Sequence, residues 1–354
     1  MTTRRAARQS ASGAVTIKDI AERLDISPST VGRALADDRR ISASMKQRVL
    51  KAAAEMGYVA NHAARMMRGA SSNLVGLMVP DIRNSFYATI AHALSKCLEP
   101  EGFRLTLSET DDNGLTELQH IRALTSAKTA GIIIVPSAQP HPDSINLLNE
   151  TPHIQLLRWR ATLSQQWFGI DDGQALYQAA THLLELGHRR IAYIGSSAQL
   201  PTGRSRVEGF QAALAGVDGA QGIEALGAPE SKSFARNAIY RLLALRSPPT
   251  AVVTGSVQHT LGILDALASD RIRVPEELSV VGFGDEPAFR WWGSGLTTVT
   301  LPVSELATAC GLWFVHQVIR QRSTNPVSYS SLCQPTLVVR GSTSPLERSG
   351  DVLR

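Results

Sequence analysis

The chain has 354 residues, of which 43% are apolar and 5% aromatic, and its 36 Lys and Arg exceed its 31 Asp and Glu. This length exceeds what one hydrophobic core normally organises, so we expect two or three domains. No run of about 18 apolar residues is present that could span a bilayer, and the basic N-terminus is not followed by the apolar stretch of a secretory signal. We therefore expect a cytoplasmic protein that has no membrane partner.

The surplus positive charge is concentrated at the N-terminus. Residues 1–70 contain 13 Lys and Arg against 6 Asp and Glu, whereas the rest of the chain contains 23 against 25. A small basic module attached to a large, nearly neutral body is typical of a DNA reader with a separate sensing domain.

Residues 16–35 have the pattern of two short helices joined by a tight turn. Thr16 can cap the first helix through its side-chain oxygen, and Pro28 suits the first turn of the second helix, after the capping residue Ser27. This arrangement places the second helix in the major groove of DNA. Arg33 is the strongest candidate for a DNA contact, because its planar guanidinium suits both guanine and phosphate. The residues expected to contact DNA in this module are Thr16, Pro28, Ser29, Thr30 and Arg33.

A third helix is expected from Ser42 or Ser44 to Met56, with Val49, Leu50, Ala53 and Met56 turned inward. Together with the first two helices it completes a DNA-binding headpiece over residues 1–60.

Residues 61–70 are expected to form a short hinge helix, which Asn61 can cap. Its main apolar feature is the pair Met66-Met67, flanked by Arg65 and Arg68. Such a helix could pack on its own domain. Alternatively, it could enter the minor groove, with an apolar wedge between bases and arginines on phosphates.

These N-terminal segments resemble the lactose-repressor (LacI/GalR) family of bacterial transcription regulators. The resemblance rests on Thr16–Leu35 and on the Gly57-Tyr58…Asn61…Ala64-Arg65 segment, and similar blocks extend to near residue 340. It implies a homodimer on an approximately palindromic operator, with Asn61, Arg65, Met67 and Arg68 at the minor groove. Three positions depart from the family pattern: Gly32 stands in place of a common serine, Ala60 in place of proline, and Met67 in place of leucine.

From Ser71 onward, apolar runs typical of buried strands alternate with helical patterns, which predicts parallel sheets covered on both faces. The expected strands are Leu74–Val79, Arg104–Leu107, Gly131–Val135, His153–Leu157, Arg190–Ile194, Ala251–Thr254 and Leu278–Phe283. The expected helices include Phe86–Leu98, Gln174–Leu186, Arg206–Ala215 and Thr260–Ala268.

The predicted fold class is therefore α/β, with an all-α helix–turn–helix headpiece at the N-terminus, and the resemblance implies that two doubly wound parallel-sheet subdomains follow it. The resemblance implies that these subdomains are similar to periplasmic sugar-binding proteins and bind a small effector between them. The core is expected over residues 71–340, with crossings near residues 168, 290 and 325. Subdomain 1 would then contain about 71–168 and 290–325, and subdomain 2 about 169–289 and 326–340. Residues 341–354 are expected to be a disordered tail, and the dimer contact is expected on the Asn84–Cys97 helix.

Ligands of such sheets bind beyond the carboxyl ends of the strands. Phe86 and Tyr87 could stack on a ring, and Arg206 matches the family arginine that typically binds effector hydroxyls or a carboxylate. The full set of expected effector-binding residues is Phe86, Tyr87, Ser137, Arg158, Arg206, Ser256 and Asp285.

Two acidic positions that are common in the family are absent, because Leu157 and Gly284 stand there. Losing carboxylates while keeping arginines would make the cleft more positive. This favours an anionic effector, a sugar acid such as gluconate or a keto-gluconate, over a neutral sugar.

Neither a metal-binding spacing of histidines nor a Gly-rich phosphate loop is present, so we expect neither a cofactor nor an enzyme. The three cysteines, Cys97, Cys310 and Cys333, are far apart and odd in number, as expected of reduced thiols. The alternatives left open are an effector-dependent activator and, less in keeping with the basic headpiece, a transport-type sugar-binding protein.

Overall fold

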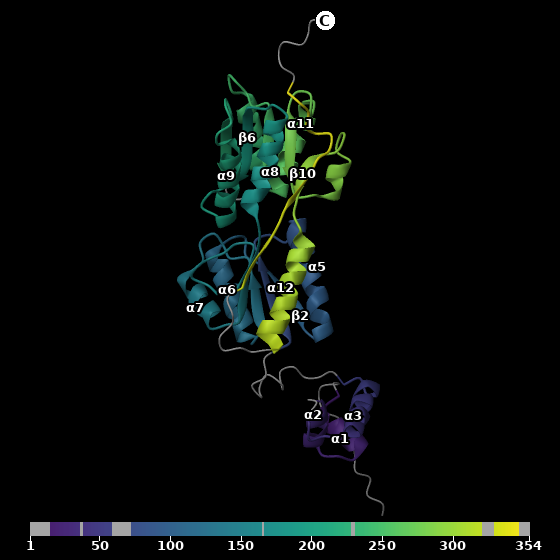
Figure 1. Ribbon diagram of the computed structural model, residues 1–354. Helices are drawn as coiled ribbons and strands as arrows, with labels where there is room; N and C mark the ends of the chain where they lie inside the picture. The colour runs from purple at the N-terminus through teal and green to yellow at the C-terminus, as the bar shows by residue number, and fades with distance from the viewer. Residues whose placement is uncertain are drawn as a thin grey trace, which may run out of the picture. The chain divides into compact units, whose positions relative to one another are not determined.

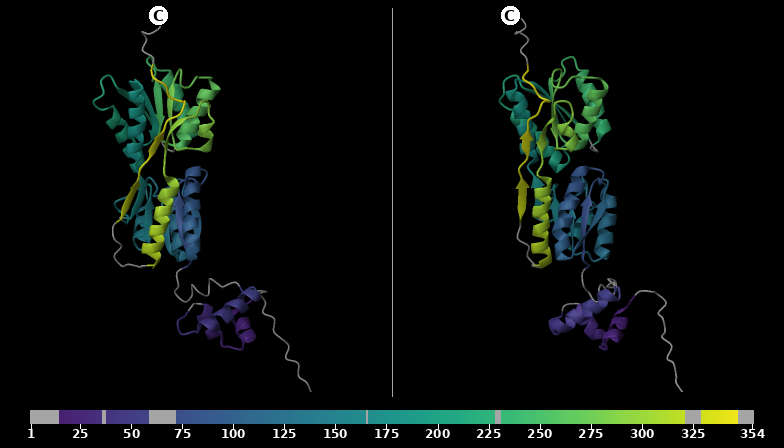
Figure 2. Two further views of the ribbon diagram at one scale, coloured as in Figure 1. Left: turned by 45° about the vertical axis from the view of Figure 1, so that its right-hand side comes forward. Right: turned by 90° about the vertical axis from the view of Figure 1, so that its right-hand side faces the viewer.

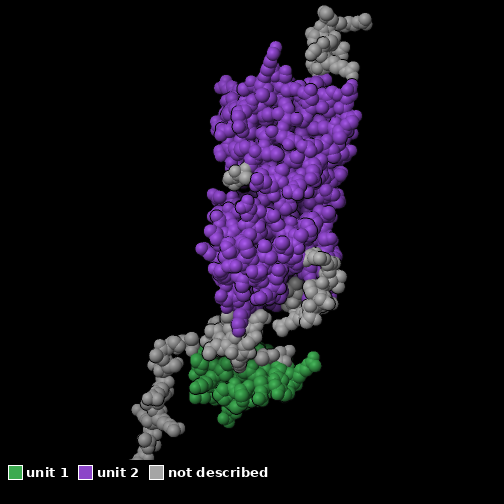
Figure 3. All heavy atoms as spheres, turned by 90° about the vertical axis from the view of Figure 1, so that its left-hand side faces the viewer, with its two compact units in different colours: residues 1–70 green, residues 71–354 purple. Residues whose placement is uncertain are grey.

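A computed structural model of the chain describes residues 15–35, 38–58, 72–164, 166–227, 231–320 and 329–346. The chain divides into two compact units, Met1–Ala70 and Ser71–Arg354, which Figure 3 shows in different colours. The expected hinge helix, with Asn61, Arg65, Met67 and Arg68, lies outside the described residues. No helix of the described segments is long and apolar enough to cross a membrane.

The first unit contains the helices α1 (Ile17–Leu24), α2 (Pro28–Leu35) and α3 (Ala43–Glu55). Ile20, Val31 and Val49, one from each helix, are fully buried in its small core. Leu50, expected to face inward, is instead 54% exposed. Its neighbour Val49 and the following Ala52 and Ala53 supply the inward face of α3, and the helical turn of 3.6 residues carries position 50 to the outside.

The second unit contains two six-stranded sheets, each covered by helices on both faces (Figure 1). The first sheet, in the order β11-β5-β4-β3-β1-β2, is wholly parallel. Its strands are β1 (Leu74–Val79), β2 (Arg104–Glu109), β3 (Gly131–Ile134), β4 (His153–Leu156), β5 (Trp167–Ile170) and β11 (Ser330–Cys333).

Two helices pack on each face of this first sheet. On one face lie α5 (Ser85–Leu98) and α12 (Val303–Trp313), the latter continued by the π-helix η3 (Phe314–Arg320), and a short turn η1 (Glu99–Glu101) follows α5. On the other lie α6 (Gly114–Ser126) and α7 (Pro142–Asn149). The first sheet and these helices are called the first lobe below.

The second sheet has the order β12-β10-β9-β8-β6-β7 and is parallel except for β12. Its strands are β6 (Arg190–Ser196), β7 (Gln221–Gly227), β8 (Ala251–Thr254), β9 (Ser279–Phe283), β10 (Thr297–Thr300) and β12 (Thr336–Val338). Two helices, α8 (Asp172–Glu185) and α9 (Pro201–Leu214), cover one face, and α10 (Lys232–Leu243) and α11 (Val257–Ser269) cover the other. These elements and the turn η2 (Pro287–Arg290) form the second lobe.

The chain passes between the lobes three times, and two of the passages differ from the expected positions. β5 ends at Ile170 in the first sheet, close to the first expected crossing. The second crossing lies between β10 and α12, beyond residue 300 rather than near 290, because β10 pairs with β9 in the second sheet. The third lies between β11 and β12 rather than near residue 325. Figure 2 shows these last two strands following one another along both lobes.

The expectation of a disordered tail from residue 341 is wrong for residues 341–346. Ser342 is 1% exposed, its hydroxyl donates to the Val280 carbonyl at 2.6 Å, and it accepts from the Thr297 N–H at 2.8 Å. The Leu346 N–H donates to the Leu186 carbonyl at 2.9 Å. These long-range bonds attach the segment to the second lobe, and residues 347–354 lie outside the described part of the chain.

Candidate functional site

The candidate DNA-contacting face is the outer side of α2. Val31 and Ala34 are buried against α1 and α3, so the opposite side, with Pro28, Ser29 and Arg33, is exposed. The Ser27 hydroxyl accepts from the Thr30 N–H at 3.2 Å and fixes the start of the helix. The sequence pattern alone therefore predicts which side of α2 is available to a DNA groove.

Thr16 and Thr30 have structural contacts of their own. The Thr16 hydroxyl donates to Asp19 at 2.8 Å, and the Asp19 carboxylate also accepts from the Thr16 N–H at 2.7 Å, which completes a capping box at the start of α1. The Thr30 hydroxyl lies 2.8 Å from that of Ser27. Both threonines thus hold helix ends in place, beside the exposed side chains of α2.

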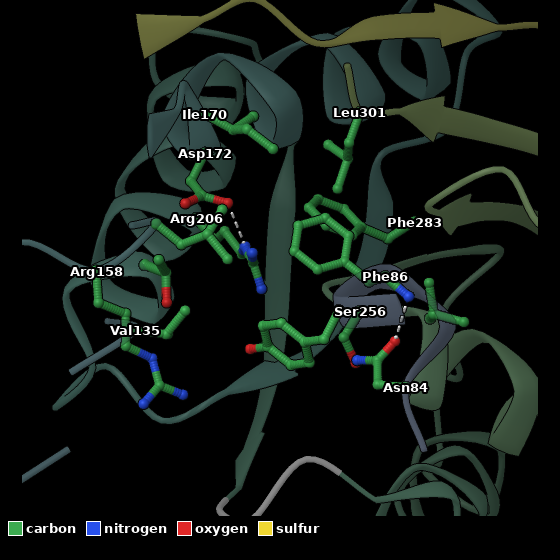
Figure 4. Close-up of a pocket in the computed structure, with 14 residues that line it drawn as sticks. Asn84, Phe86, Val135, Arg158, Ile170, Asp172, Arg206, Ser256, Phe283 and Leu301 are labelled. Atoms are coloured by element: carbon green, nitrogen blue, oxygen red, sulfur yellow. Dashed lines mark hydrogen bonds and ion pairs between the residues drawn. The ribbon is translucent and has the colours of Figure 1, made fainter. Parts of the chain in front are cut away.

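The second unit contains a pocket whose walls come from both lobes, beyond the carboxyl ends of the strands (Figure 4). Five of the seven expected effector residues line it: Phe86, Tyr87, Arg158, Arg206 and Ser256. The other residues of the lining are Asn84, Val135, Leu157, Ile170, Asp172, Thr202, Val257, Phe283 and Leu301. Eight of these fourteen residues are apolar or aromatic and six are polar or charged, so the lining combines apolar walls with groups that can orient a small molecule.

Arg206 is held rigidly at the second-lobe wall. Its Nε donates to Asp172 Oδ1 at 2.7 Å and its Nη1 to the Gly255 carbonyl at 2.6 Å. Its guanidinium also stacks 4.5 Å from the centre of the Phe283 ring, a cation–π contact. Figure 4 shows Arg206 and Asp172 facing each other inside the pocket. The two together offer a ligand fixed hydrogen-bond donors beside a carboxylate acceptor.

Aromatic rings from both lobes line the pocket. Phe86 and Tyr87, in the first turn of α5, form an edge-to-face pair with centroids 5.4 Å apart. Phe283 ends β9 in the second lobe. Asn84 fixes the position of the first pair, because its side chain caps α5 by accepting from the Phe86 N–H at 3.2 Å.

Arg158, the cation of the first-lobe wall, is buried and paired. Its Nη1 donates to Asp112 Oδ1 and, at 3.1 Å, to the Pro136 carbonyl. Asp112 Oδ1 also accepts from the Ala138 N–H at 2.9 Å, so one carboxylate joins the loops that follow β2, β3 and β4. Each arginine of the pocket therefore has its own aspartate, and the pocket is less positive than the sequence argument assumes.

Behind this wall lies a fully buried acid. Glu117 is 0% exposed and accepts from the Ser137 N–H at 2.6 Å. Burial raises the pKa of Glu117, whereas hydrogen bonds from Ser137 lower it by less. Arg160 donates to the Ser137 carbonyl at 3.1 Å, and burial lowers the pKa of this guanidinium. The loop after β3 is thus held from two sides by charged groups.

Ser137 and Asp285, both expected in the effector site, do not line the pocket. Ser137 is 0% exposed and lies behind the wall, where its backbone binds Glu117 and Arg160. Asp285 turns away to form an ion pair with Arg340 at 2.9 Å and another with Arg290 at 3.4 Å. Asp285 therefore connects the loop after β9 to the C-terminal segment.

Leu157 and Asp172 line the pocket although the sequence did not mark them as ligand-binding. Leu157 has φ 64°, and the Arg158 N–H donates to the Leu156 carbonyl at 2.7 Å, so a tight three-residue turn ends β4. A left-handed leucine is strained by roughly 1–2 kcal/mol. The adjacent Asp171 caps α8, accepting from the Gln174 N–H at 2.9 Å, whereas the Asp172 carboxylate accepts from Arg206. The adjacent acidic pair was the only signal for Asp172.

Within the described residues, no group of three His, Cys, Asp or Glu side chains is arranged to bind a metal ion. The polar groups of the pocket are paired with one another or with backbone carbonyls, which suits binding and orientation of a ligand.

Comparison with known families and structures agrees with this two-part organisation. Residues 16–61 match "Bacterial regulatory proteins, lacI family", and residues 180–343 match "Periplasmic binding protein-like domain". The transcriptional regulator DegA of Bacillus subtilis is 29% identical over 94% of this chain and 98% of its own length. The transcriptional repressor CytR of Escherichia coli is 28% identical over 94% and 97%.

The fold also matches a solved structure over nearly its whole length. The lac repressor dimer bound to operator and the anti-inducer ONPF has a TM-score of 0.79, with 21% identity, over 94% of this chain and 99% of that one. Both of the relatives named above are regulators of transcription rather than enzymes. The chain therefore carries a DNA-binding domain of the lacI family over residues 16–61 and a periplasmic-binding-protein-like domain over residues 180–343, and it is similar to transcriptional regulators over nearly its whole length.

Proposed function

We propose that this regulator represses transcription by binding an approximately palindromic operator as a homodimer, and that a small sugar or sugar acid in the pocket controls its operator affinity. The observation that carries the proposal is the presence in one chain of an exposed recognition face on α2 and a pocket walled by two lobes. The repressor relative, and the fold neighbour described as a dimer on its operator, support the same reading.

The control is proposed to act through closure of the lobes. A ligand between two walls contacts both only when they are close, so it binds the closed state more tightly and shifts the population toward it. The coupling between two such sites is typically about 1–3 kcal/mol. The proposed link to DNA is the segment 61–70, with Asn61, Arg65, Met67 and Arg68 at the minor groove.

The proposed effector is a sugar acid, gluconate or a keto-gluconate. Two arginines line the pocket, and Leu157 and Gly284 supply no carboxylate. Since Asp172 already binds Arg206, an acidic ligand has to share that guanidinium, whereas a neutral sugar could use both members of the pair. This difference gives the two ligand classes opposite responses to the loss of Asp172.

Operator binding is tested by fluorescence anisotropy with DNA fragments selected by the full-length protein. An Arg33→Ala variant is expected to weaken selective binding by about 10- to 100-fold, as for the loss of one bidentate base contact. Arg23→Ala is the matched control, because Arg23 lies in the same module but pairs with Glu55 at 2.6 Å. Equal losses in the two variants would contradict the assigned recognition face.

The effector class is tested by calorimetry with gluconate, 2-keto-gluconate, galactose and ribose. Binding of the acids, strengthened in Asp172→Asn, is the expected result, because the variant removes the carboxylate that competes for Arg206. Binding of the neutral sugars alone, weakened in the same variant, would refute the acid and leave a sugar effector in its place.

A further inference from the structure

A hydrogen bond joins the two lobes at the edge of the pocket. The Ser85 hydroxyl, at the start of α5 in the first lobe, donates to Glu286 Oε1, in the loop after β9 in the second lobe. The residues on either side of Ser85, Asn84 and Phe86, line the pocket, as does Phe283 close to Glu286. The bond therefore lies next to both walls, and any movement that separates the walls stretches it.

The first-lobe end of this bond has a rigid base. α5 has 14 residues, and Ile90, Leu94 and Leu98 fix it in the core of the first lobe with 0% exposure. Its first turn contains no acidic residue, although a negative charge there would be stabilised by the helix dipole. Glu286 places that missing charge at the start of α5, from the other lobe.

The second-lobe end is equally constrained. The Glu286 carbonyl accepts from the Phe289 N–H at 2.9 Å, at the start of the turn η2, and the preceding Asp285 is anchored by Arg340 at 2.9 Å. Gly284 has φ 82°, and its missing Cβ would lie 2.5 Å from Val257 Cγ2. Since the backbone at both ends is anchored in its own lobe, separation of the lobes moves the Ser85 hydroxyl and the Glu286 carboxylate apart.

We propose that Ser85 and Glu286 form a latch that holds the lobes closed in the absence of effector. The latch raises the population of the closed state in the free protein. The apparent effector affinity is the affinity of the closed state multiplied by the fraction of molecules that are closed, and an effector shifts the remaining open molecules to the closed state. This role in effector control rests on the proposed function, but the latch itself is a property of the free protein. Weakening it lowers effector affinity without altering any residue that lines the pocket.

The test is hydrogen–deuterium exchange of the full-length protein, without DNA or effector. Ser85→Ala is expected to speed exchange not only near its own site but also in residues 284–292 of the opposite lobe, and Glu286→Ala, which removes the acceptor, to do the same in residues 84–90. Loss of one net hydrogen bond predicts an increase of about threefold to tenfold. Ser85→Thr, which keeps the hydroxyl, should restore the exchange rates of the original protein, and the double variant should match either single variant.

Asp265→Asn is the control, because it breaks an exposed ion pair, with Arg236 at 3.1 Å, that lies within the second lobe. It should leave exchange in residues 84–90 unchanged. Increases confined to the substituted residue's own lobe, or no increase in either lobe, would overturn the latch. Since neither DNA nor effector is present, those outcomes leave operator control untouched, and a failure of operator binding would leave the latch intact.

Discussion

The two lobes have nearly the same strand order, yet different polar groups hold their loops together. In the first lobe, Asp112, Glu117 and Arg158 gather at the carboxyl ends of the strands, directly behind the pocket. In the second lobe, His188 precedes β6 at the amino end and lies 2.8 Å from the Thr250 hydroxyl. The fold therefore determines where a pocket forms, but each lobe supports its half differently.

The largest expected effect is a difference in stability between variants of the two arginine–aspartate pairs of the pocket. The side chains of Arg206 and Asp172 are 12% and 9% exposed, whereas those of Arg158 and Asp112 are 9% and 29% exposed. Removing one partner of a buried pair typically costs about 3–5 kcal/mol because the remaining charge stays out of water. We expect Arg206→Met to cost about 3 kcal/mol in urea unfolding and Arg158→Met roughly half of that, since water reaches Asp112.

The double variant Arg206→Met/Asp172→Leu is the control for this comparison. It removes both charges, so most of the lost stability should return if the single variant suffers from a buried carboxylate. A double variant as unstable as Arg206→Met, or equal costs at the two sites, would show that packing rather than charge dominates the second-lobe wall.

The ends of β4 and β9 give the next comparison, because both turn through a left-handed residue beside the pocket. The second lobe uses Gly284 at φ 82°, and the first uses Leu157 at φ 64°. Gly284→Ala is expected to cost about 2 kcal/mol, from backbone strain and the contact with Val257.

Leu157→Gly should cost much less than Gly284→Ala, because it relieves strain of about 1–2 kcal/mol while it removes a partly buried side chain. Thermal unfolding of the two variants side by side measures the difference. A larger cost at Leu157 than at Gly284 would mean that the leucine side chain, rather than its backbone, stabilises this turn.

Alternation of strands and helices was sufficient to predict parallel sheets covered by helices on both faces, since long apolar runs such as Leu74–Val79 depend only on local sequence, and the division into two lobes came from the family resemblance. The alternation did not reveal β10, a short run of threonines and valine that belongs to the second sheet only through its pairing with β9 and β12. The second crossing was misplaced for that reason, and the third because β11 (Ser330–Cys333) belongs to the first sheet through its pairing with β5.

In the candidate site, too, some residues could be predicted from the sequence, whereas their long-range contacts could not. Phe86 could be expected in the pocket because it follows a strand end, and Arg158 and Arg206 because they match arginines of the family that the sequence resembles. The ion pairs that bind Asp285 to Arg340 and Asp112 to Arg158 join residues far apart in the sequence, and no local pattern specifies them. The exclusion of Asp285 from the pocket and the neutralisation of Arg158 were therefore visible only in three dimensions.

A smaller effect follows from the buried acid of the first lobe. Burial raises the pKa of Glu117, so its contribution to stability is fully present below the ordinary value of 4.5 and is lost as pH rises through the folded-state value. Glu117→Gln keeps an acceptor for the Ser137 N–H and cannot ionise. We expect it to be more stable than the original protein at pH 8, with a gain that disappears by pH 4.5 in urea titrations. A pH-independent gain would assign the effect to packing.

The smallest expected effect concerns His188 and has the opposite sign with pH. Burial lowers the pKa of His188, so its contribution is present above the ordinary value of 6.5 and is lost as pH falls through the folded-state value. The ring also contacts the Ser344 carbonyl at 3.2 Å, which ties the effect to the C-terminal segment. His188→Gln should lower the free energy of unfolding by about 1 kcal/mol at pH 8, as for one lost hydrogen bond. In this variant the free energy of unfolding should also fall less steeply as the pH is lowered.

The control for this prediction is His153 in the first lobe. Burial lowers the pKa of His153 too. Among the described residues, the hydrogen bonds of its ring stay within the first lobe, with the Thr151 carbonyl at 2.9 Å and the Ser164 N–H at 3.0 Å. His153→Gln should therefore also make the free energy of unfolding fall less steeply with acid, but it should leave hydrogen exchange in residues 341–346 unchanged. His188→Gln should speed hydrogen exchange in those residues. If both variants speed exchange in residues 341–346 equally, then loss of either histidine loosens the whole second unit, and the local contacts of each ring do not determine which segment opens.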